Sequence, residues 1–505
     1  MLGATYSRIV RQLMSTEVKI GDVKLPVQTN PQNEPLVPAG FVSRFGDDFD
    51  ADEVVSHLRW MAQKVLMRQD MFLLGAPSPL RRHVVLSLAE LCGYEVEYMS
   101  ITRDTTEADL KQRREIAGND LIFTDQAPVR AAIHGRLLIL DGVENAERNV
   151  LPTLNNLLEN REMALEDGRF LMRQEAIDAI QADSGAIRPT SDASQLVAVH
   201  PKFRVVALAL AVPPYPGRPL DPPLRSRFQS RFVDELGVTS ALECITYPRG
   251  GQNFPRDKLT ALASVYEGLR VLRDEATMAV GGAGGVSSVP TFSLDGLQHA
   301  INLISHHPNL SVAQAISRAI PLGYRWRDAG ISPVIGSLPP RLQSLLDDVA
   351  QTLHRHDKEH SDVHLPSIEE LGPAASLMDA MTNHQRQVVV EVRQDLALGR
   401  SVCIHGARGC GKSFILDAVA APNQWTLFPL YEEMTGRDLL QRRDTTKSSS
   451  NSSSNSSSNS SGDNNGELES LWVDSPLVAA ARKGEVIVLD GIDRADAQAL
   501  LPLRR

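Results

Sequence analysis

Short apolar runs, each bounded by polar or glycine-rich segments, recur along the chain and predict buried β-strands. We expect the sheet of an α/β core from four of these runs, near residues 71–75, 96–100, 137–141 and 203–210. Between residues 241 and 345 the apolar spacing becomes helical, as in the segment 297–304. A further apolar run at 401–405, expected to be a strand, leads through a glycine-rich loop to residues 414–420, which can continue as a helix. The pattern predicts two α/β modules with a mostly helical segment between them.

The loop that follows the run at 401–405 matches the phosphate-binding pattern G-x-x-x-x-G-K-[ST] in full, as Gly406-Ala407-Arg408-Gly409-Cys410-Gly411-Lys412-Ser413. Its glycines allow backbone N–H groups to turn toward phosphate oxygens, and the N-terminus of the following helix adds positive potential. We expect Lys412 to reach the β and γ phosphates of ATP and the Ser413 hydroxyl to bind Mg²⁺. The alternative is a glycine-rich turn between a strand and a helix that carries a lysine by chance.

The two modules repeat one another in sequence, which strengthens the assignment of the loop. The run 109–115 of the first module resembles the run 438–444 of the second. Each module also has one aspartate that precedes, at identical spacing, the aspartate that ends an apolar run, namely Asp125 and Asp141, and Asp474 and Asp490. The second copy differs mainly by an insertion at 448–466, composed almost entirely of Ser, Asn and Gly. Such a segment cannot bury a core, and we predict a disordered loop.

Asp490 is the candidate for the second half of the site. A carboxylate at the C-terminal end of a buried strand beside a phosphate loop holds Mg²⁺ through water. An apolar run followed by Asp is common, so the assignment depends on the complete phosphate loop and on the tandem copy. Gly491 follows directly, at the position where many such sites have a glutamate that polarises the attacking water. Asp493 is the nearby candidate to replace it, although it lies beyond the end of the strand.

The first module departs from the phosphate-binding pattern. Four of its residues, Ser78, Leu80, Arg81 and Arg82, stand where the second module has Gly409, Gly411, Lys412 and Ser413. A branched side chain at Leu80 would lie where the backbone must approach phosphate, and Arg82 lacks the hydroxyl that binds Mg²⁺. The run 203–210 also ends with apolar residues. We predict a structural role for this module, with nucleotide bound at the second.

The chain resembles the AAA ATPases of the dynein- and midasin-like branch, and in particular the von Willebrand factor A domain-containing protein 8 family. The resemblance covers most of the chain from about Asp52 onward and is densest in the segments 103–115, 149–162 and 219–228. It implies tandem AAA P-loop modules, each a parallel sheet flanked by helices, with a helical lid after the first. It also implies ATP and Mg²⁺ as cofactors, hydrolysis coupled to conformational change, and other AAA modules of the same or a neighbouring chain as partners.

The family also implies a von Willebrand A domain near the C-terminus, with a D-x-S-x-S metal motif. This sequence contains neither. We therefore expect a fragment or a truncated gene product, in which the second module is incomplete. A fragment of this kind would bind ATP without hydrolysing it efficiently. A second hypothesis is a scaffold that uses ATP only to hold the geometry between modules.

Arg227 is a candidate arginine finger. In AAA proteins the arginine before Phe in a segment such as 224–228 often stabilises the charge of the transferred phosphate at a neighbouring site. Arg225 is a second candidate. The alternative for Arg227 is a surface arginine held in a salt bridge, and the sequence leaves both open.

The following domain boundaries result. Residues 1–45 are expected to be a transit peptide and linker, 46–240 a degenerate α/β core, 241–345 the helical lid, 346–380 a charged linker, and 381–505 the second core. No acidic residue precedes Glu17, and Tyr6, Ile9, Val10 and Leu13 would share one helical face. That basic amphipathic pattern is typical of mitochondrial transit peptides, although an ordinary disordered start would also fit. The family resemblance favours a mitochondrial location.

Composition narrows the other possibilities. A net charge of −10 and a pI near 5.8 argue against a general nucleic-acid-binding protein, and no apolar run approaches the length of a membrane span. The four cysteines form no CxxC pair. His356, Glu359 and His360 satisfy the H-x-x-E-H pattern of some zinc peptidases. They lie in the charged linker without an evident third ligand, so we interpret them as part of a solvated, histidine-rich segment.

Overall fold

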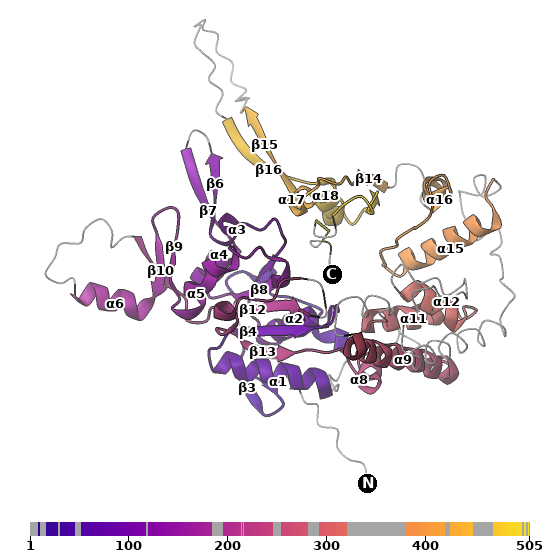
Figure 1. Ribbon diagram of the computed structural model, residues 1–505, viewed down its shortest axis with the longest axis horizontal. Helices are drawn as coiled ribbons and strands as arrows, with labels where there is room; N and C mark the ends of the chain where they lie inside the picture. The colour runs from indigo at the N-terminus through magenta and orange to yellow at the C-terminus, as the bar shows by residue number, and fades with distance from the viewer. Residues whose placement is uncertain are drawn as a thin grey trace, which may run out of the picture.

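The computed structural model gives the arrangement of both modules (Figure 1). It describes residues 9–10, 17–28, 31–45, 52–117, 120–183, 195–213, 215, 217–245, 254–280, 292–320, 380–419, 425–447, 468–496, 499–500 and 503. The predicted insertion 448–466, the H-x-x-E-H segment 356–360 and most of the predicted transit peptide lie outside the described residues. No helix of the described part is long and apolar enough to cross a membrane.

The first module is built on a five-stranded parallel sheet in the order β13-β4-β12-β8-β5. Its strands are β4 Met71–Gly75, β5 Val96–Ser100, β8 Leu137–Asp141, β12 Arg204–Leu210 and β13 Gln229–Phe232. The first four occupy the runs predicted from the sequence. In this order β12 lies between β4, which leads into the loop at 75–82, and β8, which ends in Asp141. The predicted α/β class, a parallel sheet flanked by helices, is thus confirmed for this module.

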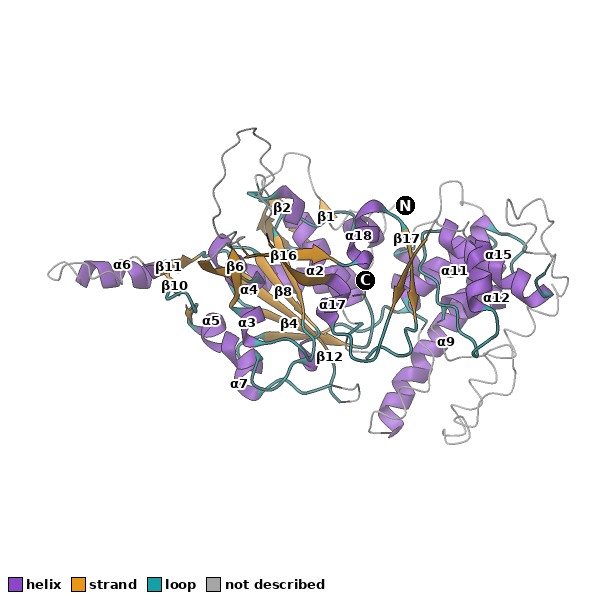
Figure 2. Cartoon of the chain, turned by 90° about the horizontal axis from the view of Figure 1, so that it is seen from above, coloured by secondary structure: helices purple, strands orange, loops and turns teal. Residues whose placement is uncertain are grey.

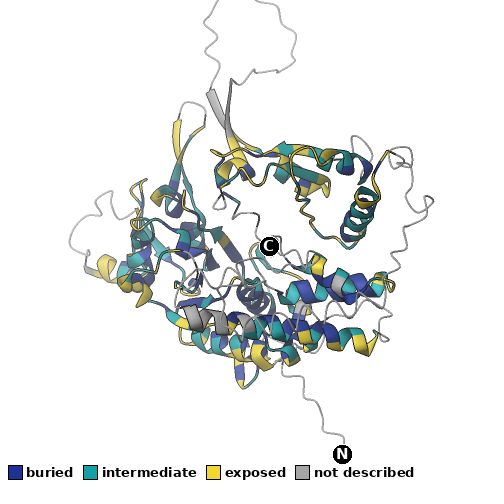
Figure 3. Cartoon of the chain, turned by 45° about the vertical axis from the view of Figure 1, so that its right-hand side comes forward, coloured by how far each residue is buried: buried dark blue, intermediate teal, exposed yellow. Residues whose placement is uncertain are grey.

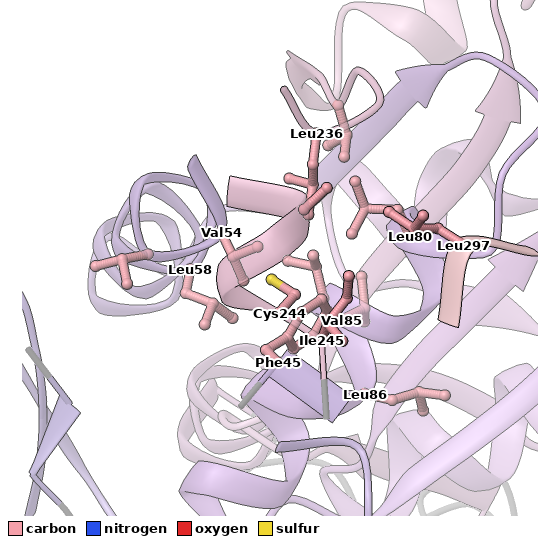
Figure 4. Packing of buried hydrophobic residues seen from close by; sticks show 14 of the residues in the cluster. Phe45, Val54, Leu58, Leu80, Val85, Leu86, Leu236, Cys244, Ile245 and Leu297 are labelled. Carbon is pink, nitrogen blue, oxygen red and sulfur yellow. The ribbon is translucent and has the colours of Figure 1, made fainter. Parts of the chain in front are cut away.

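Helices cover both faces of this sheet because the strands are apolar on both sides. Successive residues of one strand point to opposite faces of the sheet: Leu73 packs into one hydrophobic cluster and Phe72 into the other. One face is covered by α1 Asp52–Leu66 and α2 Leu80–Cys92, and the other by α4 Ala127–His134 and α5 Asn155–Glu159. Figure 3 shows the buried residues concentrated here, and Figure 4 shows the packing around Leu58, Val85 and Ile245.

The remaining strands and helices of the first module lie outside its five-stranded sheet. Two of them, β6 Gln112–Ala117 and β7 Asp120–Asp125, form an antiparallel hairpin that projects from the module (Figure 1). A small sheet in the order β11-β10-β9 lies beside it. The other elements are β9 Met163–Ala164, β10 Phe170–Arg173, β11 Leu196–Val199, α3 Glu107–Leu110, α6 Gln174–Asp183, α7 Pro222–Arg225, η3 Val143–Asn145 and η4 Leu151–Leu154.

Residues 17–45, which the sequence analysis assigned to a transit peptide and linker, pack onto the first module instead. Strands β2 Glu17–Ile20 and β3 Val23–Pro26 form a hairpin whose Val18, Ile20 and Leu25 are fully buried in the core beside α1 and α2. The Gln28 backbone N–H donates to the Cys92 carbonyl at 2.8 Å. Strand β1 Ile9–Val10 pairs with β2, so Ile9 and Val10 are not helical here. The turns η1 Glu34–Leu36 and η2 Val42–Phe45 complete the segment. Mitochondrial targeting stays a prediction.

A histidine attaches the edge strand β13 to α1. The Arg231 Nε donates to His57 Nδ1 at 2.7 Å and its Nη2 to Ser56 Oγ at 2.9 Å, while the guanidinium lies over the Trp60 ring. His57 must therefore be neutral on Nδ1. Burial, and then the neighbouring Arg231 charge, lower the pKa of His57 from 6.5 to about 4.

This contact predicts an acid-sensitive stability. As pH falls from 6.5 toward 4, the unfolded chain takes up a proton on His57 and the folded chain does not, so folding free energy is lost across that window. We expect a loss on the order of 2–3 kcal/mol. His57→Gln keeps an acceptor for Arg231 and cannot titrate, so its urea denaturation should change less between pH 6.8 and pH 4.2. His306→Gln, at an exposed histidine, is the control. Equal acid sensitivity of His57→Gln and the native chain would contradict the assignment.

The helical segment after the first module lies where the sequence placed a lid. It contains α8 Val238–Glu243, α9 Arg256–Val280, α11 Leu294–His306 and α12 Val312–Ala319. This segment continues into the second module through α15 Asn383–Ala397, because Asp395 of α15 bonds to Arg318 Nη2 at 2.7 Å and His299 Nε2 at 3.1 Å. The Arg400 Nη2 adds a bond to the Asp295 carbonyl at 3.2 Å. The lid helices and α15 therefore form one packed group, visible in Figures 1 and 2.

The second module repeats only part of the first sheet. Strands β14 Trp425–Pro429 and β17 Val486–Asp490 pair in parallel, with Pro429 opposite Asp490 as Ser100 lies opposite Asp141 in the first module. The other elements are α16 Lys412–Val419, α17 Gly436–Leu440, β15 Gln441–Lys447, β16 Leu468–Asp474 and α18 Pro476–Lys483. Most of β17 is only half-buried or exposed, whereas β8 is almost wholly buried (Figure 3).

The predicted strand at 401–405 is wrong: these residues have no regular secondary structure. In the first module the equivalent strand β4 lies between β12 and β13. No strand among the described residues of the second module pairs with 401–405. An apolar run forms a strand only when neighbouring backbone completes its hydrogen bonds, and here that neighbour is missing.

Candidate nucleotide-binding site

The phosphate loop has the open backbone that its glycines predict. Gly409 and Gly411 take φ of +80° and +89°, a region that residues with a β-carbon rarely adopt. A Cβ at Gly406 would lie 2.6 Å from Cys410 Sγ, and one at Gly411 would lie 2.7 Å from Gln385 Nε2. Helix α16 begins directly at Lys412, so its first N–H groups face the end of the loop. These features fit a group with anionic oxygens.

Lys412 is held by the loop itself. Its Nζ donates to the carbonyls of Gly406 at 2.8 Å and Ala407 at 3.0 Å. Both bonds are to neutral acceptors, and charge-assisted bonds to an anion are stronger. Ser413 follows on the first turn of α16 and is exposed. The loop therefore offers a cation and a hydroxyl at its open side, as the sequence predicted for phosphate and Mg²⁺.

Gln385 is a loop contact that the sequence analysis missed. It lies near the start of α15, whose N-terminus is closed by a capping box with Thr382. The Gln385 Nε2 donates to the Cys410 carbonyl at 3.2 Å. Helix α15 also packs on α16 through Val389, Ile415 and Ala418. The loop thus rests on α15, which the Asp395 contacts join to the lid helices of the first module. The capping-box residues were a readable signal for the helix, although not for its contact.

Asp490 ends β17 as predicted, with an exposed carboxylate. Its backbone carbonyl accepts from Leu430 N at 2.8 Å, the counterpart of the Ile101–Asp141 bond in the first module. Its side chain is 63% exposed and lies 3.6 Å from the Arg494 guanidinium. A carboxylate with this exposure is free to exchange a surface arginine for a metal-bound water.

The structure does not bring Asp490 and the phosphate loop together. The bonds of the loop lead to α15, and the bonds of Asp490 lead to Leu430 and Arg494. In Figure 1, α16 lies with α15 beside α11 and α12, whereas β14, α17 and α18 form a separate group. The physical reason is the strand order. In the first module β12 pairs with both β4 and β8, and the described part of the second module has no strand in that place.

Gly491, at the position where a glutamate was expected, has a backbone conformation that favours glycine. Its φ is +78°, and Gly142, its counterpart after Asp141, has φ +85°. A Cβ at Gly491 would meet the Arg494 guanidinium at 2.1 Å. Both modules thus turn sharply after the strand aspartate, in a conformation that favours glycine. Asp493 lies beyond this turn and is exposed, and no hydrogen bond or ion pair between described residues joins it to the phosphate loop. Its role as the substitute base stays a prediction.

In the first module an arginine occupies the magnesium side of the site. Arg82, the counterpart of Ser413, places its Nη2 2.5 Å and its Nε 3.1 Å from Asp141 Oδ2. The Tyr98 hydroxyl donates to the same oxygen, and the Arg82 guanidinium lies over the Tyr98 ring. Burial is the largest cause that raises the pKa of Tyr98, so the phenol stays protonated and donates. A protein cation therefore neutralises the carboxylate that would otherwise attract Mg²⁺.

The loop of the first module is also closed by packing. Leu80 is the first residue of α2 and is buried in the same hydrophobic cluster as Leu297 of α11 (Figure 4). Arg81 is buried and donates to the Ala76 carbonyl, as Lys412 donates to Ala407. Ser78 and Leu80, the counterparts of Gly409 and Gly411, do not have positive φ, so the left-handed turns of the second loop are absent here. The predicted departures from the phosphate-binding pattern thus have a defined structural basis.

Arg227 has the contacts of the salt-bridge alternative. Its guanidinium pairs with Glu159 and donates to the Pro223 carbonyl. Arg225 lies at the end of α7 and is exposed. The contacts given for Arg227 are to Glu159 and Pro223, within the first module. An arginine finger that acts on the nucleotide of another module is compatible with this position. The finger role of Arg227 or Arg225 stays a prediction.

The described residues contain no group of three or more His, Cys, Asp or Glu side chains placed to hold a metal ion. For Mg²⁺ the second module offers Ser413 and Asp490, which would have to approach one another. The zinc alternative at His356, Glu359 and His360 lies outside the described residues.

Comparison with known proteins gives the same two modules as the structure. The family described as AAA domain (dynein-related subfamily) matches residues 70–228 and 401–503, about half of the chain. Von Willebrand factor A domain-containing protein 8 of Mus musculus is 39% identical over 511 residues, which covers 97% of this chain and 25% of the relative. The chain therefore spans about a quarter of the length of that curated relative.

Two further matches are more distant. Midasin of Giardia intestinalis is 27% identical over 112 residues, covering 22% of this chain and 2% of the relative. A crystal structure from Cytophaga hutchinsonii, described as that of a candidate ATPase, aligns with 63% of this chain and 94% of its own. That alignment has 14% identity and a TM-score of 0.27.

Proposed function

Because the chain belongs to the dynein-related subfamily of AAA domains, we propose that its second module binds ATP with Mg²⁺ and that its first module does not. The observation that carries this proposal is the contrast between the two loops. The second keeps two left-handed glycines and a lysine that bonds to its own loop carbonyls and to the Cys410 thiol. The first replaces them with buried Leu80, buried Arg81 and the Arg82–Asp141 pair.

Ser413 and Asp490 would hold Mg²⁺, which would supply positive charge to the phosphates of bound ATP. The Gly406–Ser413 backbone would cradle the phosphates, Lys412 would leave its own carbonyls for them, and Ser413 would face the metal. Asp490 would hold metal-bound water once β17 and the loop lie side by side. In this view ATP links α15 and α16 to the β14–β17 unit, and binding is coupled to a change in their relative position. Membership of the AAA family is the reason for proposing ATP hydrolysis as the activity of the whole protein.

A titration of the purified chain with ATP tests this proposal. We expect one site per chain by isothermal titration calorimetry, with affinity that falls when EDTA removes Mg²⁺. One site is expected because only one loop can receive phosphate. Two sites of similar affinity would contradict the proposed division between the modules. If ATP produces no heat and does not displace a fluorescent analogue, the proposal that the chain binds ATP is wrong.

The second candidate is a scaffold that binds ATP without turning it over. The specific observation in its favour is Gly491, whose backbone conformation disfavours a glutamate at the usual place. Both candidates share the binding step and differ only in phosphate release.

A further inference from the structure

The second module consists of two units, each packed around its own hydrophobic cluster. The first, which we call the loop unit, comprises α15, the phosphate loop and α16, and Ile415 is buried in its cluster. The second, which we call the strand unit, comprises β14, β17, α17, α18 and the hairpin β15–β16. Leu439 of α17 is buried in its cluster, and Leu489 of β17 packs against it. Asp490 follows Leu489 directly, so it belongs to the strand unit, whereas Ser413 belongs to the loop unit.

Each unit is attached to the first module at a different place. The loop unit is attached to the lid helices through the contacts of Asp395. The strand unit is attached to the hairpin β6–β7, because β16 lies beside β6 (Figures 1 and 2). The two halves of the nucleotide site, Ser413 and Asp490, are therefore held by the first module at two separate positions.

Two side chains of the strand unit make the contact with the first module. The Trp472 indole N–H donates to Glu115 Oε1 at 2.8 Å, and the Arg113 guanidinium lies 5.5 Å from the centroid of the indole ring. A cation over the ring and an acceptor for its N–H satisfy both properties of a tryptophan side chain. Near the base of the hairpins, Arg437 of α17 pairs with Asp109. We call these three interactions the hairpin contact.

The hairpin contact and Asp490 belong to one packed structure. Helix α17 carries both Arg437 and the buried Leu439. Ser475, which follows β16, donates from its backbone N–H to the Leu440 carbonyl at 2.9 Å and from its hydroxyl to the Leu439 carbonyl at 2.6 Å. A movement of the hairpin β15–β16 therefore carries β17 and Asp490 with it.

The hairpin contact can open without leaving a buried charge unpaired. When Arg437 leaves, Asp109 still accepts from Arg113 Nη2 at 2.8 Å and still closes the capping box of α3. Glu115 likewise keeps its bond from the Thr124 hydroxyl at 2.9 Å. The two side chains of the strand unit are already partly exposed, so water replaces their partners at little cost.

The attachment of the loop unit to the lid is harder to open. Asp395 is buried, and Arg318 donates to it at 2.7 Å. Arg318 also donates to the Gln394 side chain and to the Glu391 carbonyl, both at 2.8 Å. Separating the two units here would leave a buried carboxylate without its arginine, which is strongly destabilising. Of the two attachments, the hairpin contact is therefore the one that yields when Ser413 and Asp490 approach one another.

We propose that Arg437 and Trp472 are positioning residues: the hairpin contact holds Asp490 away from Ser413 in the unliganded chain and opens when ATP binds with Mg²⁺. This inference rests on the proposed function and deepens it, because it names what regulates the site. The free energy that the contact contributes without nucleotide is lost when the two units close on ATP. The contact therefore lowers the affinity for ATP, and its removal raises that affinity by the same factor.

Titration of the complete chain with a fluorescent ATP analogue and Mg²⁺ tests this inference. We expect Arg437→Gln and Trp472→Leu each to bind more tightly than the native chain, and the double variant to gain on the order of tenfold in affinity. Arg482→Gln is the matched control, because Arg482 is an exposed arginine whose ion pair, with Asp474, stays within the strand unit. It should bind like the native chain. Circular dichroism checks that each variant keeps the fold.

The fluorescence of Trp472 gives a second measurement. The indole leaves Arg113 and Glu115 for water when the contact opens, so saturating ATP with Mg²⁺ should shift the tryptophan emission of the native chain to longer wavelength. The shift should be absent in Trp472→Leu, which removes one of the four tryptophans, and in Lys412→Ala. Unchanged or lower affinity in the double variant, or native emission that does not respond to bound ATP, would overturn this inference and leave the proposed function standing. Absence of ATP binding in the native chain and in every variant would overturn both.

Discussion

Replacing Lys412 with alanine is expected to remove measurable ATP binding, with a loss of at least about a hundredfold in affinity. The Lys412 ammonium now bonds to the Gly406 and Ala407 carbonyls and would exchange them for phosphate oxygens. Each hydrogen bond to a charged partner contributes about 1.5–3 kcal/mol, so two of them account for a factor of this size. A fluorescent ATP analogue with Mg²⁺ present measures the affinity directly.

Arg81→Ala is the matched control for this prediction, because Arg81 is the counterpart of Lys412 in the first module and bonds to the equivalent carbonyl. It should leave the affinity for ATP unchanged, after circular dichroism has shown that α2 still folds. If Lys412→Ala binds ATP like the native chain, the phosphate loop assignment is wrong. If Arg81→Ala lowers the affinity as much as Lys412→Ala, the first module contributes to binding.

Slow turnover is the second large effect that we expect. Gly491 provides no carboxylate to polarise water, and general-base catalysis typically contributes 10²–10⁴-fold. Against a median kcat of about 10 s⁻¹ for enzymes, phosphate release by this chain should stay below about 0.1 s⁻¹. The separation of Ser413 from Asp490 acts in the same direction, because Mg²⁺ needs both sides of its site. Release of inorganic phosphate at saturating ATP is the measurement.

Lys412→Ala serves here as the control for contaminating ATPases. A rate near 10 s⁻¹ that depends on Lys412 would show that another group, with Asp493 as the first candidate, supplies the base. Gly491→Glu is not expected to raise the rate. Its backbone would have to keep φ near +78°, at a cost of about 1–3 kcal/mol, and its side chain would collide with Arg494.

The central sheet could be predicted from the sequence because its strands are buried on both faces. Apolar runs such as 137–141 and 203–210 have no other stable place in a water-soluble fold. The N-terminal hairpin also left a signal, since Val18, Ile20, Val23 and Leu25 alternate with polar residues around the turn at Gly21. The nearby prolines led us to interpret that segment as a linker. The alternation was the stronger evidence, because it matches one buried face.

Other features depend on partners far away in the sequence. The run at 401–405 has the composition of a strand and lacks the neighbour that would complete it. The hairpin at 112–125 is rich in charge and shows little apolar alternation, so periodicity does not reveal it. The sequence did identify Arg82 as a departure from the phosphate-binding pattern. It could not show that Tyr98, from the adjacent strand β5, would complete a bonded set around Asp141.

The Arg82–Asp141 pair has a consequence for how the first module responds to the state of the cell. The Arg82 guanidinium is part of the chain, so it cannot diffuse away from Asp141 as a dissolved ion can. Its local concentration is also higher than that of any competing ion in solution. The charge of Asp141 is therefore neutralised without an ion from solution. On the function proposed above, the first module would not change with nucleotide, and it would serve as the fixed part of the chain relative to which the second module moves.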